Sequence, residues 1–324
     1  MKKKIVSLLL AAMMALSITA CGGSGSADGG AAADVYNIGI CQLIQHPALD
    51  SATRGFQDAL VEKLGDKVVF DVQVAAGDTA SCSTITNTFA ANQYDLILAN
   101  ATAALQSASA STADIPILGT SITDYATARD ADNWTGVTGK NISGTSDLAP
   151  LDQQAACLNE LFPEAKTIGI LYCSSEANSQ YQANVITEEL EALGYTCKTY
   201  TFTDSNDVSQ VTKSACDDSD VIYVPTDNIV ANCTEAINNV ALPAGVPIFA
   251  GESGICSGCG VATLSIDYYD LGYQTGLMAY DILENGKNPA EMEIQFASNV
   301  TKQYNATNAA ELNVTIPADY VVIE

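Results

Sequence analysis

The chain has 324 residues, of which 38 are acidic and 13 are basic, so its formal net charge at pH 7 is −25. Such an acidic surface would be repelled by nucleic acids and by anionic lipid, which excludes a DNA- or RNA-binding protein. The length is sufficient for two lobes that each bury a hydrophobic core.

The N-terminal region has the features of an exported, membrane-anchored protein. Three lysines precede a short apolar run in residues 1–20, which is the pattern of a secretory signal peptide. Small residues then lead to Cys21, as at the cleavage site of bacterial lipoproteins, and residues 21–34 have the composition of a flexible tether. We therefore expect a lipid on Cys21 to anchor the protein to the outer face of the bacterial cell membrane, without a transmembrane span. The alternative is an ordinary signal peptide beside a coincidental cysteine.

Strands and helices alternate from position 35 onwards. The strands of the first half are expected at 35–41, 68–74, 95–99 and 115–118, and its helices at 48–64, 81–92 and 102–111. Residues 120–133 are expected to be irregular, and residues 136–139 to form a short strand that leads to a crossover near Gly144. Alternation of this kind is typical of a parallel sheet covered by helices.

The second half of the chain repeats this scheme. Its strands are expected at 167–172, 196–202, 220–224 and 246–250, and its helices at 150–161, 176–193, 206–215 and 229–240. Three short segments of the first half also recur in the second, in the same order and about 130 residues further on. The sequence therefore predicts two similar α/β halves.

Further elements follow these two halves. Residues 261–264 are expected to form a strand, 268–283 a helix, and 294–296 and 320–323 two short strands. We infer that the chain returns to the first half and then crosses back, with hinge segments near 140–147, 264–267 and 292–297. The predicted fold class is thus α/β, with two Rossmann-like lobes whose parallel sheets are joined by three hinges and can close on a ligand. Lobe 1 would comprise 35–143 and 267–293, and lobe 2 would comprise 144–266 and 294–324.

The most informative loop follows the expected strand 220–224. This strand is a buried run rich in β-branched residues, and Pro225 ends it. Thr226, Asp227 and Asn228 then offer a hydroxyl, a carboxylate and an amide in front of a helix. Ligands of open parallel sheets bind at the carboxyl ends of the strands, so we predict that Asp227 meets a positively charged group on a small molecule. The alternative is that Asp227 caps its own helix.

Several segments carry a resemblance to a known family. They are residues 46–50, 95–102, 144–148, 172–179, 223–228 and 266–272, in order along nearly the whole chain after position 35. In these segments the chain resembles the tryptophan-type substrate-binding lipoproteins of ABC importers, which have the type I periplasmic-binding-protein fold. The resemblance implies that a monomer captures an aromatic amino acid (tryptophan, tyrosine or phenylalanine) between its lobes and delivers it to an ABC permease in the membrane. The alternatives are a surface ligand sensor and a binder of a different small polar metabolite.

Three positions depart from the pattern of that family. Gln45 stands where an acid is common, Tyr125 where a proline is common, and Tyr273 where an arginine is common. The first two lie in loops that would line the cleft, so the bound amino acid could differ from that of other family members.

An amino acid carries an ammonium and a carboxylate, and burying either group without a partner is costly. The chain has only two arginines, Arg54 and Arg129, and Arg54 lies within an expected helix, so a bidentate arginine clamp on the carboxylate is not expected. Hydroxyls and backbone N–H groups at helix N-termini are the alternative, and Thr102, Ser121 and Ser175 stand at such places. Each of the three could equally be an ordinary cap or turn residue.

Further candidates come from the other loops of the expected cleft. Gln45 and His46 leave the first strand, although a lone histidine before a proline is more often structural. Glu176 and Asn178 begin a helix at the same rim, where they could bind ligand or cap the helix. Tyr268 lies beside a hinge and could face an aromatic ligand or pack within the hinge. The predicted ligand-binding set is Gln45, His46, Thr102, Ser121, Ser175, Glu176, Asn178, Thr226, Asp227, Asn228 and Tyr268.

No catalytic centre, cofactor or metal site is expected. The chain has one histidine and lacks a glycine-rich phosphate loop, whereas an enzyme would need a nucleophile, a base and an orienting group. Nine cysteines follow Cys21, and an odd number cannot pair fully within one chain. Cys256 and Cys259 have the spacing of a redox or metal motif without a second pair or a thioredoxin-like context, so we interpret them as incidental thiols or a local disulfide.

Overall fold

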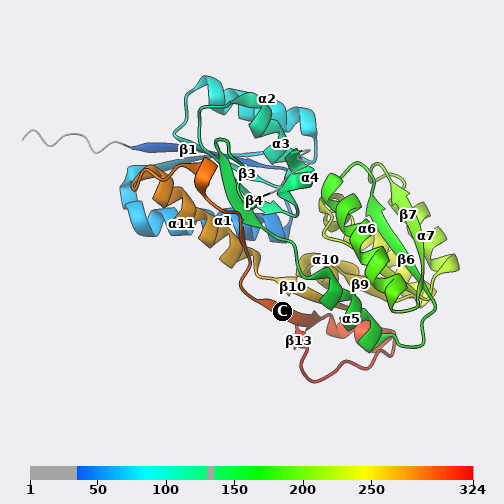
Figure 1. Cartoon of the computed structure of the whole chain (residues 1–324). Coiled ribbons are helices and arrows are strands. Elements are labelled where there is room, and N and C mark those ends of the chain that lie inside the picture. Colours follow the sequence, from blue (N-terminus) through cyan, green and yellow to red (C-terminus); the bar gives the residue numbers. More distant parts are fainter. Residues whose placement is uncertain (1–34, 130–134, 324) are drawn as a thin grey trace, which may run out of the picture. The chain divides into compact units, whose positions relative to one another are not determined.

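The computed structural model describes residues 35–129 and 135–323. The predicted signal peptide, Cys21 and the tether therefore lie outside the described residues. Within the described part, no helix has both the length and the apolar content that crossing a membrane requires. These residues build two mostly parallel sheets, each covered by helices (Figure 1).

The first sheet has the strand order β11-β5-β4-β3-β1-β2, and each of its neighbouring pairs is parallel. Its strands are β1 (Tyr36–Gln42), β2 (Val68–Val74), β3 (Leu96–Asn100), β4 (Ile117–Ile122), β5 (Ile142–Ser146) and β11 (Gln295–Phe296). The helices of this half are α1 (Pro47–Leu64), α2 (Thr79–Ala91), α3 (Thr102–Ser111), α4 (Tyr125–Arg129) and α11 (Tyr268–Leu283), with short 3₁₀ turns at Gly65–Lys67 and Pro289–Glu291.

The two faces of the first sheet belong to different cores. Ile38 and Ile40 of β1 point into the core that contains Phe56 of α1 and Met278 of α11. Cys41, the next residue along the strand, points into the core of α2 and α3 on the opposite face. This alternation follows from the two-residue period of a strand, so the sheet is buried on both sides.

Helices α1 and α11 run side by side along the first sheet (Figure 1). Their backbones approach closely at two glycines. A Cβ atom at Gly55 would lie 2.1 Å from the Tyr269 carbonyl oxygen, and one at Gly272 would lie 1.9 Å from the Ala52 carbonyl oxygen. Only residues without a side chain fit at these two positions.

The second sheet has the order β13-β12-β10-β9-β8-β6-β7, and β12 runs antiparallel to β10 while the other neighbouring pairs are parallel. Its strands are β6 (Thr167–Cys173), β7 (Thr196–Phe202), β8 (Val221–Val224), β9 (Ile248–Ala250), β10 (Ala262–Ile266), β12 (Val300–Tyr304) and β13 (Val321–Val322). The helices are α5 (Leu151–Leu161), α6 (Ala177–Ala192), α7 (Val208–Asp218), α8 (Asn228–Ala231), α9 (Thr234–Ala244), α10 (Ser253–Cys259) and α12 (Ala306–Glu311).

The chain passes between the sheets three times, as the extra elements at its end indicated. The first crossing follows β5, the second is Asp267 between β10 and α11, and the third lies between β11 and β12. The expected lobe boundary at 143 is too early, because β5 pairs with β4 as far as Ser146. The boundary at 293 is also too early, since Gln295 and Phe296 pair with β5 in the first sheet.

Some local predictions were wrong. Residues 136–139, where a strand was expected, are irregular with bends, and the strand lies at β5 instead. Part of the segment expected to be irregular continues β4 and then forms α4, while residues 130–134 lie outside the described residues. The helix expected at 229–240 is divided into α8 and α9, with Asn232 and Cys233 between them.

Candidate functional site

A small pocket lies where loops of the two sheets meet, and we call it the central pocket. It is lined by His46, Leu49, Ser121, Asp147, Thr226, Asp227, Asn228, Ala231, Glu252 and Tyr268. Its free volume is about 10 Å³, which is room for about one water molecule. The lining residues up to Asp147 lie at or after the ends of β1, β4 and β5 of the first sheet. The others, from Thr226 onwards, follow β8, β9 and β10 of the second sheet. The pocket therefore lies at the carboxyl ends of strands from both sheets.

Three carboxylates share this pocket. Asp147, Asp227 and Glu252 are only 4%, 1% and 2% exposed, and no lysine or arginine is among the described residues that line the pocket. Burial raises the pKa of Asp147 to about 6 and that of Glu252 to about 7. Burial, assisted by the nearby charge of Glu176, raises the pKa of Asp227 to about 8. Three buried acids without a basic partner form a site that favours a cation.

Asp227 and Glu252 each hold the start of a helix. Asp227 Oδ1 accepts a hydrogen bond from Val230 N at 2.8 Å, and Oδ2 accepts one from Cys173 N at 2.7 Å. Glu252 accepts from the backbone N–H groups of Gly254 and Ile255 at the start of α10. The capping alternative for Asp227 is therefore present in the structure, and both carboxylates also line the central pocket.

Asp147 is held differently. It follows β5 directly, and its carboxylate accepts hydrogen bonds from Thr123 Oγ1 at 3.1 Å and from the Tyr268 hydroxyl at 3.0 Å. Both donors are neutral side chains, and Asp147 caps no helix in the described residues. Neither Asp147 nor Glu252 was among the residues predicted from the sequence, although each lies in the loop after a strand, as Asp227 does.

Two buried polar atoms in the pocket have no hydrogen-bond partner among the described residues. They are His46 Nδ1 and Ser121 Oγ. The other ring nitrogen of His46 lies 3.2 Å from Asn228 Oδ1, and burial lowers the pKa of the imidazole. Ser121 has a φ of 55°, in the left-handed region that is costly for residues other than glycine. Unpaired groups of this kind in a carboxylate-lined pocket are what a zwitterionic ligand would satisfy.

A second cavity, here called the outer pocket, contains most of the remaining predicted residues. Its volume is about 120 Å³, and it is lined by Leu43, Gly77, Thr79, Thr102, Ala103, Gln106, Ser175, Glu176, Ala177, Asn178 and Ile229. Glu176 does not cap its own helix there. Its carboxylate accepts from the side-chain amides of Asn178 and Asn228 and from the backbone N–H groups of Asn228 and Ile229, so it fixes the start of α8.

All but one of the predicted residues thus line either the central pocket or the outer pocket. Gln45 is exposed and lines neither pocket. Tyr125, the second departure from the family pattern, does not face the site either, because its hydroxyl is buried beside the carbonyls of Gly119 and Thr145.

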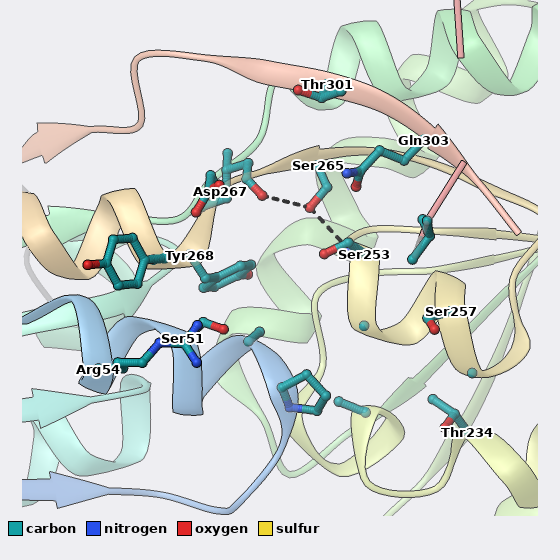
Figure 2. A pocket seen from close by; sticks show the side chains of 18 residues that line it. Ser51, Arg54, Thr234, Ser253, Ser257, Ser265, Asp267, Tyr268, Thr301 and Gln303 are labelled. Carbon is teal, nitrogen blue, oxygen red and sulfur yellow. Dashed lines mark hydrogen bonds between the residues drawn. The ribbon is translucent and has the colours of Figure 1, made fainter. Parts of the chain in front are cut away.

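Another, large cavity is also lined by Tyr268 and has a volume of about 630 Å³ (Figure 2). Figure 2 shows Ser51 and Arg54 of α1 on one side of it, with Ser253, Ser257 and Gln303 opposite. Arg54 lines the large cavity and not the central pocket. Its guanidinium carbon lies 5.5 Å from the centre of the Tyr269 ring.

Neither a metal site nor a disulfide is formed in the described part of the chain. No group of three His, Cys, Asp or Glu side chains there is arranged to hold a metal ion. Cys256 and Cys259 lie buried within helix α10, not in a loop, and both are free thiols.

Comparison with known proteins agrees with this geometry. The family model of ABC transporter substrate binding proteins matches residues 37–323. The tyrosine-binding protein of Clostridioides difficile (strain R20291) is 35% identical over 302 residues, which cover 90% of this chain and 87% of that protein. The chain therefore belongs to the family of ABC transporter substrate-binding proteins, which are extracytoplasmic.

Solved structures place the fold. An ABC domain in complex with L-Trp from Streptococcus pneumonia matches with a TM-score of 0.85 and 31% identity, over 90% of this chain and 100% of that one. A ligand-free, open substrate binding protein with adhesive properties from Clostridium difficile matches with a TM-score of 0.70 and 34% identity, over 90% and 99%. A leucine binding protein from Thermotoga maritima, at 15% identity and a TM-score of 0.58, shares the fold alone. The predicted type I periplasmic-binding-protein fold is confirmed.

Proposed function

We propose that this protein captures an aromatic amino acid, which is tyrosine, tryptophan or phenylalanine, between its two lobes and delivers it to an ABC permease. The observation that carries the proposal is the set of three buried carboxylates around the central pocket. The names of two relatives, a tyrosine-binding protein and a domain in complex with L-Trp, support the ligand class.

In this proposal the ligand's ammonium lies among Asp147, Asp227 and Glu252. An ammonium donates up to three hydrogen bonds, and its charge would offset the cost of burying these carboxylates near one another. Its carboxylate would accept from groups such as Ser121 Oγ, which is buried without a partner in the described structure, and from Thr102 or Ser175. Tyr268 would contact the aromatic ring.

The lobes would move when the ligand enters. The central pocket has a volume of about 10 Å³, so an amino acid fits only if the side chains around it separate. The three chain crossings supply the hinges about which the lobes would open and then close on the ligand.

The remaining parts of the proposal concern the whole chain. A lipid on Cys21 would hold the protein, as a monomer, at the outer face of the cell membrane. Binding would occur without catalysis. A surface sensor that presents the same ligand to a receptor is the alternative function.

Isothermal titration calorimetry tests the ligand class. We expect L-tyrosine, L-tryptophan or L-phenylalanine to bind, and the matched analogue without an amino group, such as 3-phenylpropanoate for phenylalanine, to bind about 100-fold more weakly or not at all, because it leaves the carboxylates unpaired. Equal affinity for an amino acid and its analogue would contradict the proposed ammonium site. The absence of binding heat with all three amino acids would contradict the proposed ligand class.

A further inference from the structure

Two fully buried thiols lie between one strand and one helix of the first half. Cys41 is in β1 and Cys82 is in α2, and both are 0% exposed. They belong to the same hydrophobic core, on the face of the first sheet opposite to α1 and α11. Neither residue lines any of the three cavities of the candidate site.

The packing of α2 on β1 explains why these two residues meet. A Cβ atom at Gly39 would lie 2.6 Å from the ring of Phe89, so Phe89 sits directly on this glycine. Cys41 is two residues beyond Gly39 and shares its face of the strand. Cys82 is two helical turns before Phe89 and shares its face of the helix. Since a crossover helix runs back along the sheet, both steps lead towards the same end of the strand.

The two thiols also influence each other. Their mutual interaction is the largest cause of a raised pKa at Cys41 and of a lowered pKa at Cys82. Other cysteines have different partners. The Cys173 sulfur lies 2.9 Å from Ser175 Oγ, and the Cys259 thiol donates to the Ile255 carbonyl oxygen at 3.4 Å.

We propose that Cys41 and Cys82 are a site of disulfide formation, closed when the exported chain folds in the presence of a disulfide oxidant. The Cys82 thiolate attacks one sulfur of the oxidant and releases its other half as a thiolate. The Cys41 thiolate then attacks the Cys82 sulfur and releases the second half. Two protein thiols lose two protons and two electrons, and the oxidant is reduced to two thiols. Because both cysteines are fully buried in the native protein, an oxidant can reach them only before folding is complete, so the disulfide would form during folding.

The crosslink would join two segments that lead to the site. Ala75 N donates to the Gln42 carbonyl oxygen at 2.9 Å, and Gly77 N donates to the Leu43 carbonyl oxygen at 2.8 Å, so the loop before α2 already follows the end of β1. Leu43 and Gly77 line the outer pocket. A covalent link between Cys41 and Cys82 would restrain these two segments in the unfolded chain, and in the folded protein it would hold this wall of the pocket in place.

Refolding the full chain tests the proposal. The reduced, unfolded protein is refolded either in dithiothreitol or with reduced and oxidised glutathione, treated with N-ethylmaleimide under denaturing conditions, and mapped by mass spectrometry. With glutathione we expect one disulfide, between the peptides of Cys41 and Cys82, and alkylation of the other thiols. The melting temperature should then be about 5 °C higher than in dithiothreitol.

Two double variants separate this link from other effects of oxidant. The change Cys41→Ala with Cys82→Ala should remove the difference in melting temperature between the two refolding conditions, and the packing cost of the substitutions cancels because each protein is compared with itself. The change Cys256→Ala with Cys259→Ala should leave that difference intact. Full alkylation of Cys41 and Cys82 in correctly folded, oxidised protein, or a disulfide between Cys256 and Cys259 in their place, overturns the proposal.

Discussion

Asp147 is the carboxylate of the central pocket whose charge can be changed with the least effect on the backbone. Asp227 and Glu252 satisfy backbone N–H groups at the starts of helices, so replacing either would also weaken a helix cap. Asp147 accepts from the hydroxyls of Thr123 and Tyr268 and caps no helix in the described residues. A change at this residue therefore reports on the charge in the pocket.

The substitution Asp147→Asn should weaken binding of the aromatic amino acid about 10- to 100-fold, because a buried hydrogen bond to a charged group contributes about 1.5–3 kcal/mol. Asparagine keeps the size of the side chain and an acceptor oxygen. The melting temperature of the unliganded variant should not fall, since a buried charge that burial disfavours has been removed. Calorimetry and thermal unfolding measure the two effects.

Asp152→Asn is the matched control for this variant. Asp152 is exposed on α5 and lies in none of the three cavities of the site, so its neutralisation changes the net charge by the same amount without touching the pocket. We expect wild-type affinity from it. Equal affinities of the Asp147 and Asp152 variants would show that the ammonium does not lie at Asp147.

The sequence identified some residues of the pocket and missed others for physical reasons. Asp227 was found because a strong apolar run marks the strand before it. Asp147 was missed because β5 contains glycine and small polar residues, so the strand was expected elsewhere. Glu252 follows β9, which has only three residues, and it was not considered. That His46 Nδ1 and Ser121 Oγ lack partners depends on the folded neighbours, which a sequence pattern cannot show.

Among the elements, the pair α1 and α11 has the closest helix contact in the first half. The helices meet where Gly272 faces the Ala52 carbonyl and Gly55 faces the Tyr269 carbonyl. Because α11 follows the second crossing directly, this contact also fixes the start of the returning chain at Tyr268. The glycines therefore link the packing of this helix pair to the position of a residue that lines the central pocket.

Replacing Gly272 with alanine should destabilise the protein by about 1–3 kcal/mol, because the added methyl group would force the two backbones apart. Helix propensity alone would favour alanine, so the sign of the effect is diagnostic of the contact. Val61 of α1 is 51% exposed, so Val61→Ala should change stability by less than about 0.5 kcal/mol. Urea unfolding measures both variants, and a stabilised Gly272 variant would contradict the close contact.

Elements with clear periodicity were predicted well, and short polar elements were not. The expected helices at 102–111 and 268–283 agree with α3 and α11, and α11 buries a regular apolar stripe that includes Leu271, Met278 and Ile282. Helix α10 was missed because its seven residues, mostly serine, glycine and cysteine, show no apolar stripe. The antiparallel strand β12 was missed for a similar reason, as its residues are mostly polar.

At the scale of the whole molecule, the topology was predicted from the sequence, but the position of the buried charges was not. The repeated halves and the three crossings were predicted from the sequence, because they depend on the order of strands and helices. The gathering of the carboxylates was not, because Asp147 follows a strand of the first sheet while Asp227 and Glu252 follow strands of the second. Bringing the ends of both sheets together thus places like charges in one pocket, which costs free energy until a cation binds.

This cost makes stability depend on pH. The pKa values of Asp147, Glu252 and Asp227 in the folded protein are about 6, 7 and 8, whereas ordinary values are 3.8, 4.5 and 3.8. Between about pH 4 and pH 8 these three groups therefore bind more protons in the folded, unliganded protein than in the unfolded chain. Their contribution lowers the free energy of unfolding as the pH rises through this range, by up to about 1.4 kcal/mol per pH unit for each group, while the lowered pKa of His46 acts in the opposite direction.

A bound ammonium reverses this trend, because it favours the ionised carboxylates and so releases their protons on binding. The rise in melting temperature caused by a saturating aromatic amino acid should therefore be larger at pH 8 than at pH 5. Thermal unfolding with and without ligand, in 0.5 M NaCl to screen the acidic surface but not the buried pocket, measures this difference. Asp147→Asn should reduce the pH dependence. A ligand-induced shift that is the same at both pH values would mean that the ligand's positive group lies away from these carboxylates.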